Sequence, residues 1–277
     1  MEFKVELELT GNFVKSSITN SRRHTEEMSL KTAPDGLTSL VNCLEAGAKE
    51  LGYSARDLLK NTVSVTLRIP EIVTDTLTNK AGDRIGLVVS QGYEENVYGA
   101  SNNHHPVLAA ILVQDLVVGV REETNVKGKQ VSPPHEADVQ EKMSYLLNLG
   151  CDIIAVSLKN ASLNPVNEVR LKEIAQMDYP RHYLGAVPIL ISSDFSTEQD
   201  DIARTNICLL NAYTWSTLDQ FLRRVESSLR QNGYTRGLKV VQTDGEAVPI
   251  IRVTPLKTCS PAQMVSINQF IGVPTAI

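Results

Sequence analysis

Residues 3–18 read FKVELELTGNFVKSSI, and this stretch predicts how the fold begins. Apolar and polar residues alternate from Phe3 to Leu9, which is typical of a strand with one buried face. Gly11-Asn12 then supplies a turn before a second run, Phe13 to Ile18. The chain therefore begins with a predicted β-hairpin.

Outward from the hairpin, strand-like and helix-like patterns alternate. Residues 61–67 and 85–90 are β-branched runs with a helical stretch between them. Residues 152–158 and 187–191 are apolar runs on either side of a second helical stretch, and near-continuous apolar runs are typical of buried parallel strands. The longest helical pattern covers residues 196–230. We expect an α/β protein with mixed sheets, flanking helices and room for two subdomains.

Composition and charge exclude several classes of protein. The chain has 277 residues, 42% of them hydrophobic, and a formal net charge of −5 with both signs interspersed. Arg22-Arg23-His24 is followed by Glu26-Glu27 and is interpreted as a solvated turn. We therefore expect no nucleic-acid partner and no membrane partner. The start of the chain lacks the apolar core of a signal peptide, so we expect a cytoplasmic protein.

Common catalytic and metal-binding signatures are missing. The sequence contains no GxxxxGK[ST], GxGxxG, GxSxG or HExxH motif. The four cysteines are far apart, so they are interpreted as small buried hydrophobic residues, and His104-His105 as a loop pair. The acidic tract 198–201 is interpreted as favouring a helix N-terminus. We predict no catalytic residue and no metal site in this chain.

Several weak motifs, taken in order, resemble the N-terminal lobe of the hydantoinase A / 5-oxoprolinase family. No single one is specific, but their order along nearly the whole chain is hard to obtain by chance. The matching segments are Lys31-Thr32-Ala33-Pro34, residues 82–89 with Gly92-Tyr93, Asn164-Pro165-Val166-Asn167-Glu168, Arg204-Thr205, Asn211-Ala212-Tyr213, Gln242-Thr243-Asp244-Gly245 and Pro261-Ala262.

The resemblance implies an actin-like ATPase (ribonuclease H-like) lobe. Residues 1–80 would form the hairpin and the first part of the lobe, and residues 81–195 an inserted β-α-β subdomain. Residues 196–277 would supply a long helix and the closing strands. In this family two lobes clamp a nucleotide, so the chain is expected to correspond to the first lobe alone.

Departures from the family pattern fall at the nucleotide-binding elements. Glu8 stands where the family has a metal-linked Asp, and Thr10 stands where it has the first of two glycines, of which Gly11 remains. Arg68-Ile69-Pro70-Glu71 replaces the HGTT element, and Glu246 follows Asp244-Gly245 where a glycine is expected. Ser260 and Gln263 likewise replace glycines. Glu8, Gly11, Asp244 and Gly245 are therefore predicted residual nucleotide-site positions, and a tight turn is the plainer interpretation of Asp244-Gly245.

The function implied by the resemblance is that of a non-catalytic subunit of a multi-subunit ATP-dependent ketone carboxylase of the acetone or acetophenone type. Its partners would be larger carboxylase subunits in a hetero-oligomer. ATP, Mg²⁺ and bicarbonate would act in the complex, and no cofactor is expected in this chain. Two alternatives stay open: a subunit of an ATP-dependent hydantoinase- or oxoprolinase-type cyclic amide hydrolase, and a non-enzymatic binding module. Arg204 and Asn211 would either face a subunit interface or brace their helix.

Overall fold

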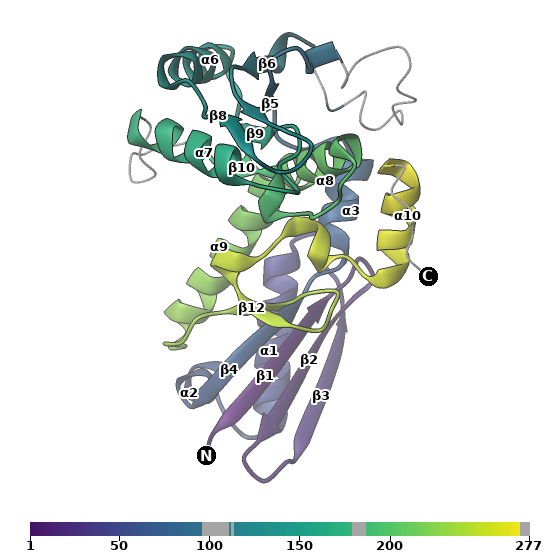
Figure 1. Ribbon diagram of the computed structural model, residues 1–277. Coiled ribbons are helices and arrows are strands. Elements are labelled where there is room, and N and C mark those ends of the chain that lie inside the picture. Colours follow the sequence, from purple (N-terminus) through teal and green to yellow (C-terminus); the bar gives the residue numbers. More distant parts are fainter. Residues whose placement is uncertain (96–110, 112–113, 179–186, 272–277) are drawn as a thin grey trace. The chain divides into compact units, whose positions relative to one another are not determined.

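The computed structural model describes residues 1–95, 111, 114–178 and 187–271 (Figure 1). The chain divides into two compact units. Unit 1 comprises Met1–Ala81 and Ser216–Met264, and unit 2 comprises Gly82–Trp215 and Val265–Ile277. Helix α8 therefore falls in unit 2, whereas the sequence-based division placed a boundary after residue 195.

Unit 1 is built on a six-stranded mixed sheet with the order β12-β11-β4-β1-β2-β3 (Figure 1). The strands are β1 (Phe3–Leu9), β2 (Phe13–Asn20), β3 (Thr25–Lys31), β4 (Thr62–Arg68), β11 (Lys239–Val241) and β12 (Ala247–Pro249). The helices are α1 (Gly36–Glu50), α2 (Ala55–Lys60), α3 (Glu71–Thr78) and α9 (Trp215–Gln231), with short 3-10 turns η3 (Ile250–Arg252) and η4 (Pro255–Thr258). Helix α10 (Pro261–Ile271) begins in unit 1 and continues past Met264 into the residues assigned to unit 2.

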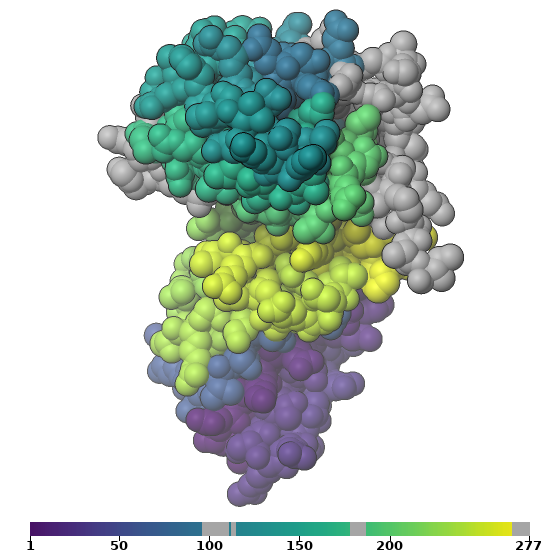
Figure 2. All heavy atoms as spheres, in the orientation of Figure 1, coloured from purple at the N-terminus to yellow at the C-terminus, as the bar shows by residue number. Residues whose placement is uncertain are grey.

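The predicted hairpin is confirmed, and a third strand extends it. Strands β1 and β2 pair in antiparallel register from Phe3↔Asn20 to Leu9↔Val14. Strand β3 was not predicted, because its side chains are only partly buried and its glutamates suggested a turn. The turn itself lies at Arg23, whose φ is 63°. These strands contribute the purple surface at the lower end of Figure 2.

One face of the sheet carries the core of unit 1. Along β1, buried residues alternate with exposed or half-buried ones, as expected for a strand covered on one side. Helix α1 packs on β2 and β3, begins at the N-cap Asp35 and is followed by Gly52, whose φ is 78°. Helix α9 adds an apolar stripe to the same core, formed by Leu218, Leu222, Val225 and Leu229.

Unit 2 is built on a parallel sheet with the order β10-β9-β5-β6. Its strands are β5 (Ile85–Ser90), β6 (Val117–Val120), β9 (Ile153–Ser157) and β10 (Ile189–Ile191), and a small hairpin is formed by β7 (Glu123–Thr124) and β8 (Gln130–Ser132). The helices are α6 (Glu136–Asn148), α7 (Val166–Asp178) and α8 (Asp201–Tyr213), with 3-10 turns η1 (Gln114–Leu116) and η2 (Ser192–Asp194). Every residue of β5, β9 and β10 is buried, which explains their unbroken apolar runs.

The prediction of one helix over residues 196–230 is wrong. The pattern is shared by two helices, α8 and α9, which are separated at Thr214. Thr214 is fully buried, and its hydroxyl donates to the carbonyl oxygen of Leu210 at 2.9 Å, so the side chain helps to end α8. Apolar spacing continues through the break, and for this reason the sequence pattern did not reveal it.

The cysteines provide a first prediction. Cys43, Cys151, Cys208 and Cys259 are all free and buried, and burial raises the pKa of each thiol, that of Cys259 to about 12. Because the thiolate is the reactive form, we expect a thiol reagent such as DTNB to modify none of them in the folded chain. All should react in denaturant, which serves as the control. A rapid reaction of the native chain would contradict the burial of these side chains.

Candidate functional site

The sheet of unit 1 brings three separate segments to one edge. Strands β1, β4 and β11 are parallel, with Glu8 opposite Arg68 and Leu67 opposite Val240. The segments that follow these strands therefore leave the sheet at the same end. They are the turn at Gly11, the start of α3 at Glu71 and the turn at Asp244. The carboxyl ends of parallel strands are common positions for ligand sites in α/β proteins.

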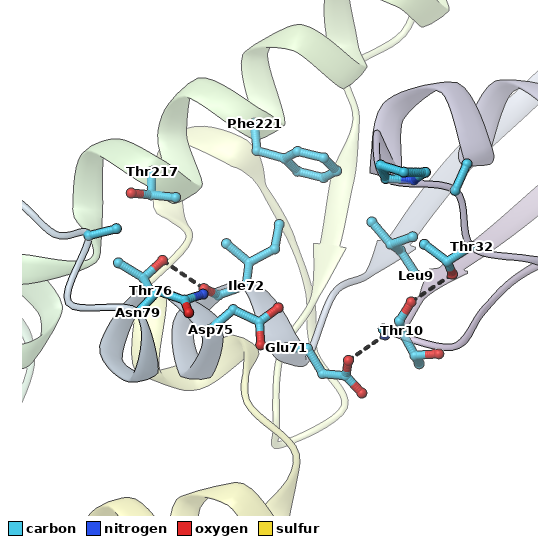
Figure 3. Close-up of a pocket in the computed structure, with 15 residues that line it drawn as sticks. Leu9, Thr10, Thr32, Glu71, Ile72, Asp75, Thr76, Asn79, Thr217 and Phe221 are labelled. Atoms are coloured by element: carbon cyan, nitrogen blue, oxygen red, sulfur yellow. Dashed lines mark hydrogen bonds between the residues drawn. The ribbon is translucent and has the colours of Figure 1, made fainter.

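A cavity of about 530 Å³ lies within unit 1 beside the first two of these segments (Figure 3). Its lining includes Thr10 and Gly11 from the hairpin turn, Glu71 and Asp75 from α3, and Phe221 from α9. Figure 3 shows the Glu71 side chain reaching toward the hairpin turn, where its Oε2 accepts a short hydrogen bond from the backbone N–H of Gly11. A carboxylate of the chain thus occupies the anion-binding position that this glycine offers.

The same side of the cavity carries a second acidic residue. Asp75 lies one helical turn after Glu71, and burial, followed by the charge of Glu71, raises the pKa of Asp75 above its usual value. A phosphate group would meet both carboxylates and be repelled by them. The residues present therefore do not fit a nucleotide phosphate at Gly11.

The other nucleotide-site segments are also held by contacts within the chain. Asp244 and Gly245 lie in an exposed turn, where Oδ1 of Asp244 accepts from the N–H of Glu246 at 2.9 Å and Gly245 has a φ of 84°. Asp244 and Gly245 thus form a tight turn, and neither residue lines the cavity. Ser260 and Gln263 form a reciprocal capping box at the start of α10, with hydrogen bonds of 3.3 and 2.8 Å.

Glu8 lies on the partly exposed face of β1. Its neighbours across the strands are Lys15 on β2 and Arg68 on β4, so this acidic side chain lies between two basic ones. Leu9, the next residue, lines the cavity. Of the four predicted positions, only Gly11 is brought into the cavity. Sequence reasoning did not identify its partner, because Glu71 is 60 residues away and no local pattern links the two.

In unit 2 the family-like motifs form a buried network. Glu168, fully buried, accepts from the N–H of Leu158 at 2.9 Å and from the hydroxyl of Ser192 at 2.6 Å. Its second oxygen accepts from the N–H of Ser193 at 2.9 Å. The hydroxyl of Ser192 in turn accepts from Nε of Arg204 at 2.9 Å. The network joins the ends of β9 and β10 to α7 and α8.

Arg204 and Asn211 lie inside unit 2 and brace it. Arg204 is fully buried and donates to the carbonyl oxygens of Leu158 and Glu198 and to the carboxylate of Asp201, the last at 2.6 Å. Asn211 is also buried and donates to the carbonyl oxygen of Ile207 at 2.9 Å. Because both side chains are buried within the chain, they brace their helix and do not face a subunit interface.

The contact between Gly82 and Tyr213 provides a second prediction. A Cβ at Gly82 would lie 2.4 Å from both the ring and the carbonyl oxygen of Tyr213, so we expect Gly82→Ala to lower the free energy of unfolding by about 1–3 kcal/mol. Chemical denaturation followed by circular dichroism measures this. Gly237→Ala is the matched control, because its Cβ would meet nothing closer than 4.0 Å. Equal stability of the two variants would contradict the close contact.

Among the residues that the structure describes, no group of three or more His, Cys, Asp or Glu side chains could hold a metal ion. His104-His105 lies outside these residues. Within the described part of the chain, no helix is long and apolar enough to cross a membrane.

The architecture places the chain among proteins with the hydantoinase-type actin-like fold. A nucleotide-free structure of acetone carboxylase matches 98% of this chain and 41% of that chain, with a TM-score of 0.75 and 18% identity. A structure of the ATP-dependent caprolactamase from Pseudomonas jessenii matches the same shares, with a TM-score of 0.78 and 17% identity. Residues 19–178 match the family described as the hydantoinase/oxoprolinase N-terminal region, and the chain belongs to this family.

Curated relatives are similar over most of this chain. The acetophenone carboxylase gamma subunit of Aromatoleum aromaticum is 26% identical over 92% of this chain and 37% of its own length. The acetone carboxylase beta subunit of Xanthobacter autotrophicus is 22% identical over 86% of this chain and 34% of its own length. The chain thus spans little more than a third of the length of these relatives.

Proposed function

We propose that this chain is a non-catalytic subunit of a multi-subunit ATP-dependent ketone carboxylase, in which it has a structural or assembly role. The similarity to acetophenone and acetone carboxylase subunits supports the choice of complex. Larger subunits would bind ATP, Mg²⁺ and bicarbonate and perform the chemistry. The chain would retain the fold of the lobe without a working nucleotide site of its own.

The hydrogen bond from the N–H of Gly11 to the carboxylate of Glu71 is the observation that supports the loss of the nucleotide site. Backbone N–H groups in a tight turn bind phosphate because they present positive charge without a side chain in the way. Here that donor is already bound to an anion, and Asp75 adds a second acidic group. The capping box at Ser260 and Gln263 satisfies donors at the start of α10 in a similar way.

Calorimetric titration of the full chain with Mg-ATP tests the loss of the nucleotide site. We expect no heat of binding from the wild-type chain. In Glu71→Ala, which removes the carboxylate and frees the N–H of Gly11, we expect detectable binding. Glu50→Ala changes an exposed glutamate outside the cavity and should behave as wild type. Binding by the wild-type chain that is abolished by Asp244→Ala would refute the proposal.

The choice of reaction is tested on the assembled complex. Purification of the chain with its native partners should yield larger hydantoinase-like subunits. The complex should then hydrolyse ATP in a manner that depends on both bicarbonate and a ketone. Hydrolysis that depends on a cyclic amide would favour the alternative, a subunit of an amide hydrolase, which the similarity to the caprolactamase alpha subunit of Pseudomonas jessenii supports. A stable monomer with no large partner would favour a non-enzymatic binding module.

A further inference from the structure

Unit 2 contains a cavity of about 320 Å³ at the reversal point of its parallel sheet. In the sheet, β5 and β9 are neighbours, with β6 beyond β5 and β10 beyond β9. The connection from β5 to β6 and the connection from β9 to β10 therefore run in opposite directions. The cavity is lined by Ser90, the last residue of β5, and by Ser157, the last residue of β9. Ligands of parallel α/β sheets bind preferentially in the crevice at such a position.

The two serine hydroxyls present acceptors to this cavity. Ser90 donates its proton to the carboxylate of Glu122 and accepts from the N–H of Lys159 at 2.9 Å. Ser157 lies 2.7 Å from the hydroxyl of Thr205, whose own proton goes to the carbonyl oxygen of Asp201. Since a hydroxyl has only one proton, Ser157 must donate to Thr205. The lone pairs left over on both serines favour a ligand that donates hydrogen bonds.

Glu122 keeps the proton of Ser90 directed away from the cavity. Its second oxygen accepts from Nδ2 of Asn167 at 2.6 Å, so both oxygens of this buried carboxylate are bonded. Burial raises the pKa of Glu122, and the hydrogen bonds from Ser90 and Asn167 act in the opposite direction. Neither Glu122 nor Asn167 lines the cavity.

A cation and an anion complete the lining. The Nζ of Lys159 lies 4.2 Å from the centroid of the Tyr93 ring, and no carboxylate of the described residues lies within ion-pair distance of it. Asp200, the N-cap of α8, supplies a carboxylate from another element. Val89 and Ile202 add apolar surface. The lining thus offers a positive group for an anion, acceptors and a carboxylate for a cation, and apolar contacts for a short side chain.

We propose that this cavity binds a small α-amino acid, with its carboxylate at Lys159 and its ammonium group at Ser90, Ser157 and Asp200. A volume of about 320 Å³ lies at the lower end of the range of small-molecule sites, which suits a ligand of this size. The site lies wholly within unit 2 and is independent of the nucleotide-site positions in unit 1. The proposal therefore does not rest on the proposed function.

Thermal melting of the full chain with each standard amino acid, followed by calorimetry of those that bind, tests the proposal. We expect at least one to raise the melting temperature, because a ligand that binds the folded state stabilises it. Lys159→Met should weaken its binding by about tenfold or more, as expected for the loss of a hydrogen bond to a charged group. Lys127→Met, which changes an exposed lysine outside the cavity, should bind as wild type.

Two ligand analogues test the zwitterionic requirement. The amide of the bound amino acid lacks the carboxylate, and the corresponding acid without the amino group lacks the ammonium, so both should bind about tenfold or more weakly. If Lys159→Met fails to fold by circular dichroism, Ser157→Ala replaces it and should also weaken binding. The proposal is overturned if no standard amino acid binds, if the folded variant binds as wild type, or if the acid without its amino group binds equally well.

Discussion

Replacement of Arg204 by Met should lower the free energy of unfolding of unit 2 by about 3–5 kcal/mol, the cost of breaking a buried ionic network by removing one partner. Arg204 is fully buried, and its guanidinium group donates to Ser192, Glu198, Leu158 and Asp201. Met fills similar space but donates no hydrogen bond. Two carbonyl oxygens would lose a donor, and Glu168 would lose the cation that reaches it through Ser192.

Trp215 provides the measurement for this variant. It is the only tryptophan of the chain, and its ring packs edge-on against Phe195 with centroids 6.3 Å apart. Denaturant unfolding followed by tryptophan fluorescence should therefore report on unit 2. Arg170→Met is the matched control within unit 2, because the Arg170 side chain is 42% exposed and its pair with Glu173 should contribute no more than about 0.5 kcal/mol. Equal stability of the two variants would show that Arg204 does not hold unit 2 together.

Replacement of Glu168 by Gln should lower the free energy of unfolding of unit 2 by about 2–3 kcal/mol, although the two side chains have nearly the same shape. Each oxygen of Glu168 accepts from a donor, Oε1 from Leu158 and Ser192, and Oε2 from Ser193. A Gln amide has only one oxygen, so in either orientation its NH₂ group would face an N–H or O–H donor. At least one buried donor would then be left unsatisfied.

The same fluorescence assay measures the loss of stability in Glu168→Gln. Glu141→Gln is the control, since the Glu141 side chain is 72% exposed and the change should alter stability by less than about 0.5 kcal/mol. The double variant of Glu168 and Arg204 should lose less than the sum of the single variants, because Ser192 connects both residues. If the two losses of stability added fully, the shared network would be contradicted. If Glu168→Gln were as stable as wild type, the three hydrogen bonds of Glu168 would be contradicted.

Much of the fold could be predicted from local patterns. The alternation in β1 and the buried apolar run in β9 were both found where the sequence placed them. These features depend on residues close together in the chain, because side-chain period and backbone freedom are local properties. The prediction failed where local signals were ambiguous, in the partly buried edge strand β3 and at the helix break at Thr214.

The roles of the motif residues could not be predicted in the same way. Glu168 and Arg204 belong to segments that resemble family motifs, but nothing in their local sequence indicates that Ser192 lies between them. Gly11 was predicted as a residual phosphate-binding position, and nothing near it indicates that a carboxylate reaches it. Ser90 and Ser157 end two apolar strands and gave no signal, since a serine at a strand end is ordinary.

The sequence by itself determined the α/β class, the hairpin, the buried parallel strands and the absence of familiar catalytic motifs. Only the tertiary structure decided which groups meet. Sheet order brings Glu71 to Gly11 across 60 residues, and the reversal between β5 and β9 brings Ser90 and Ser157 to one cavity. The physical reason is that periodicity specifies which face of an element is buried, whereas hydrogen bonds between distant side chains depend on strand order and register.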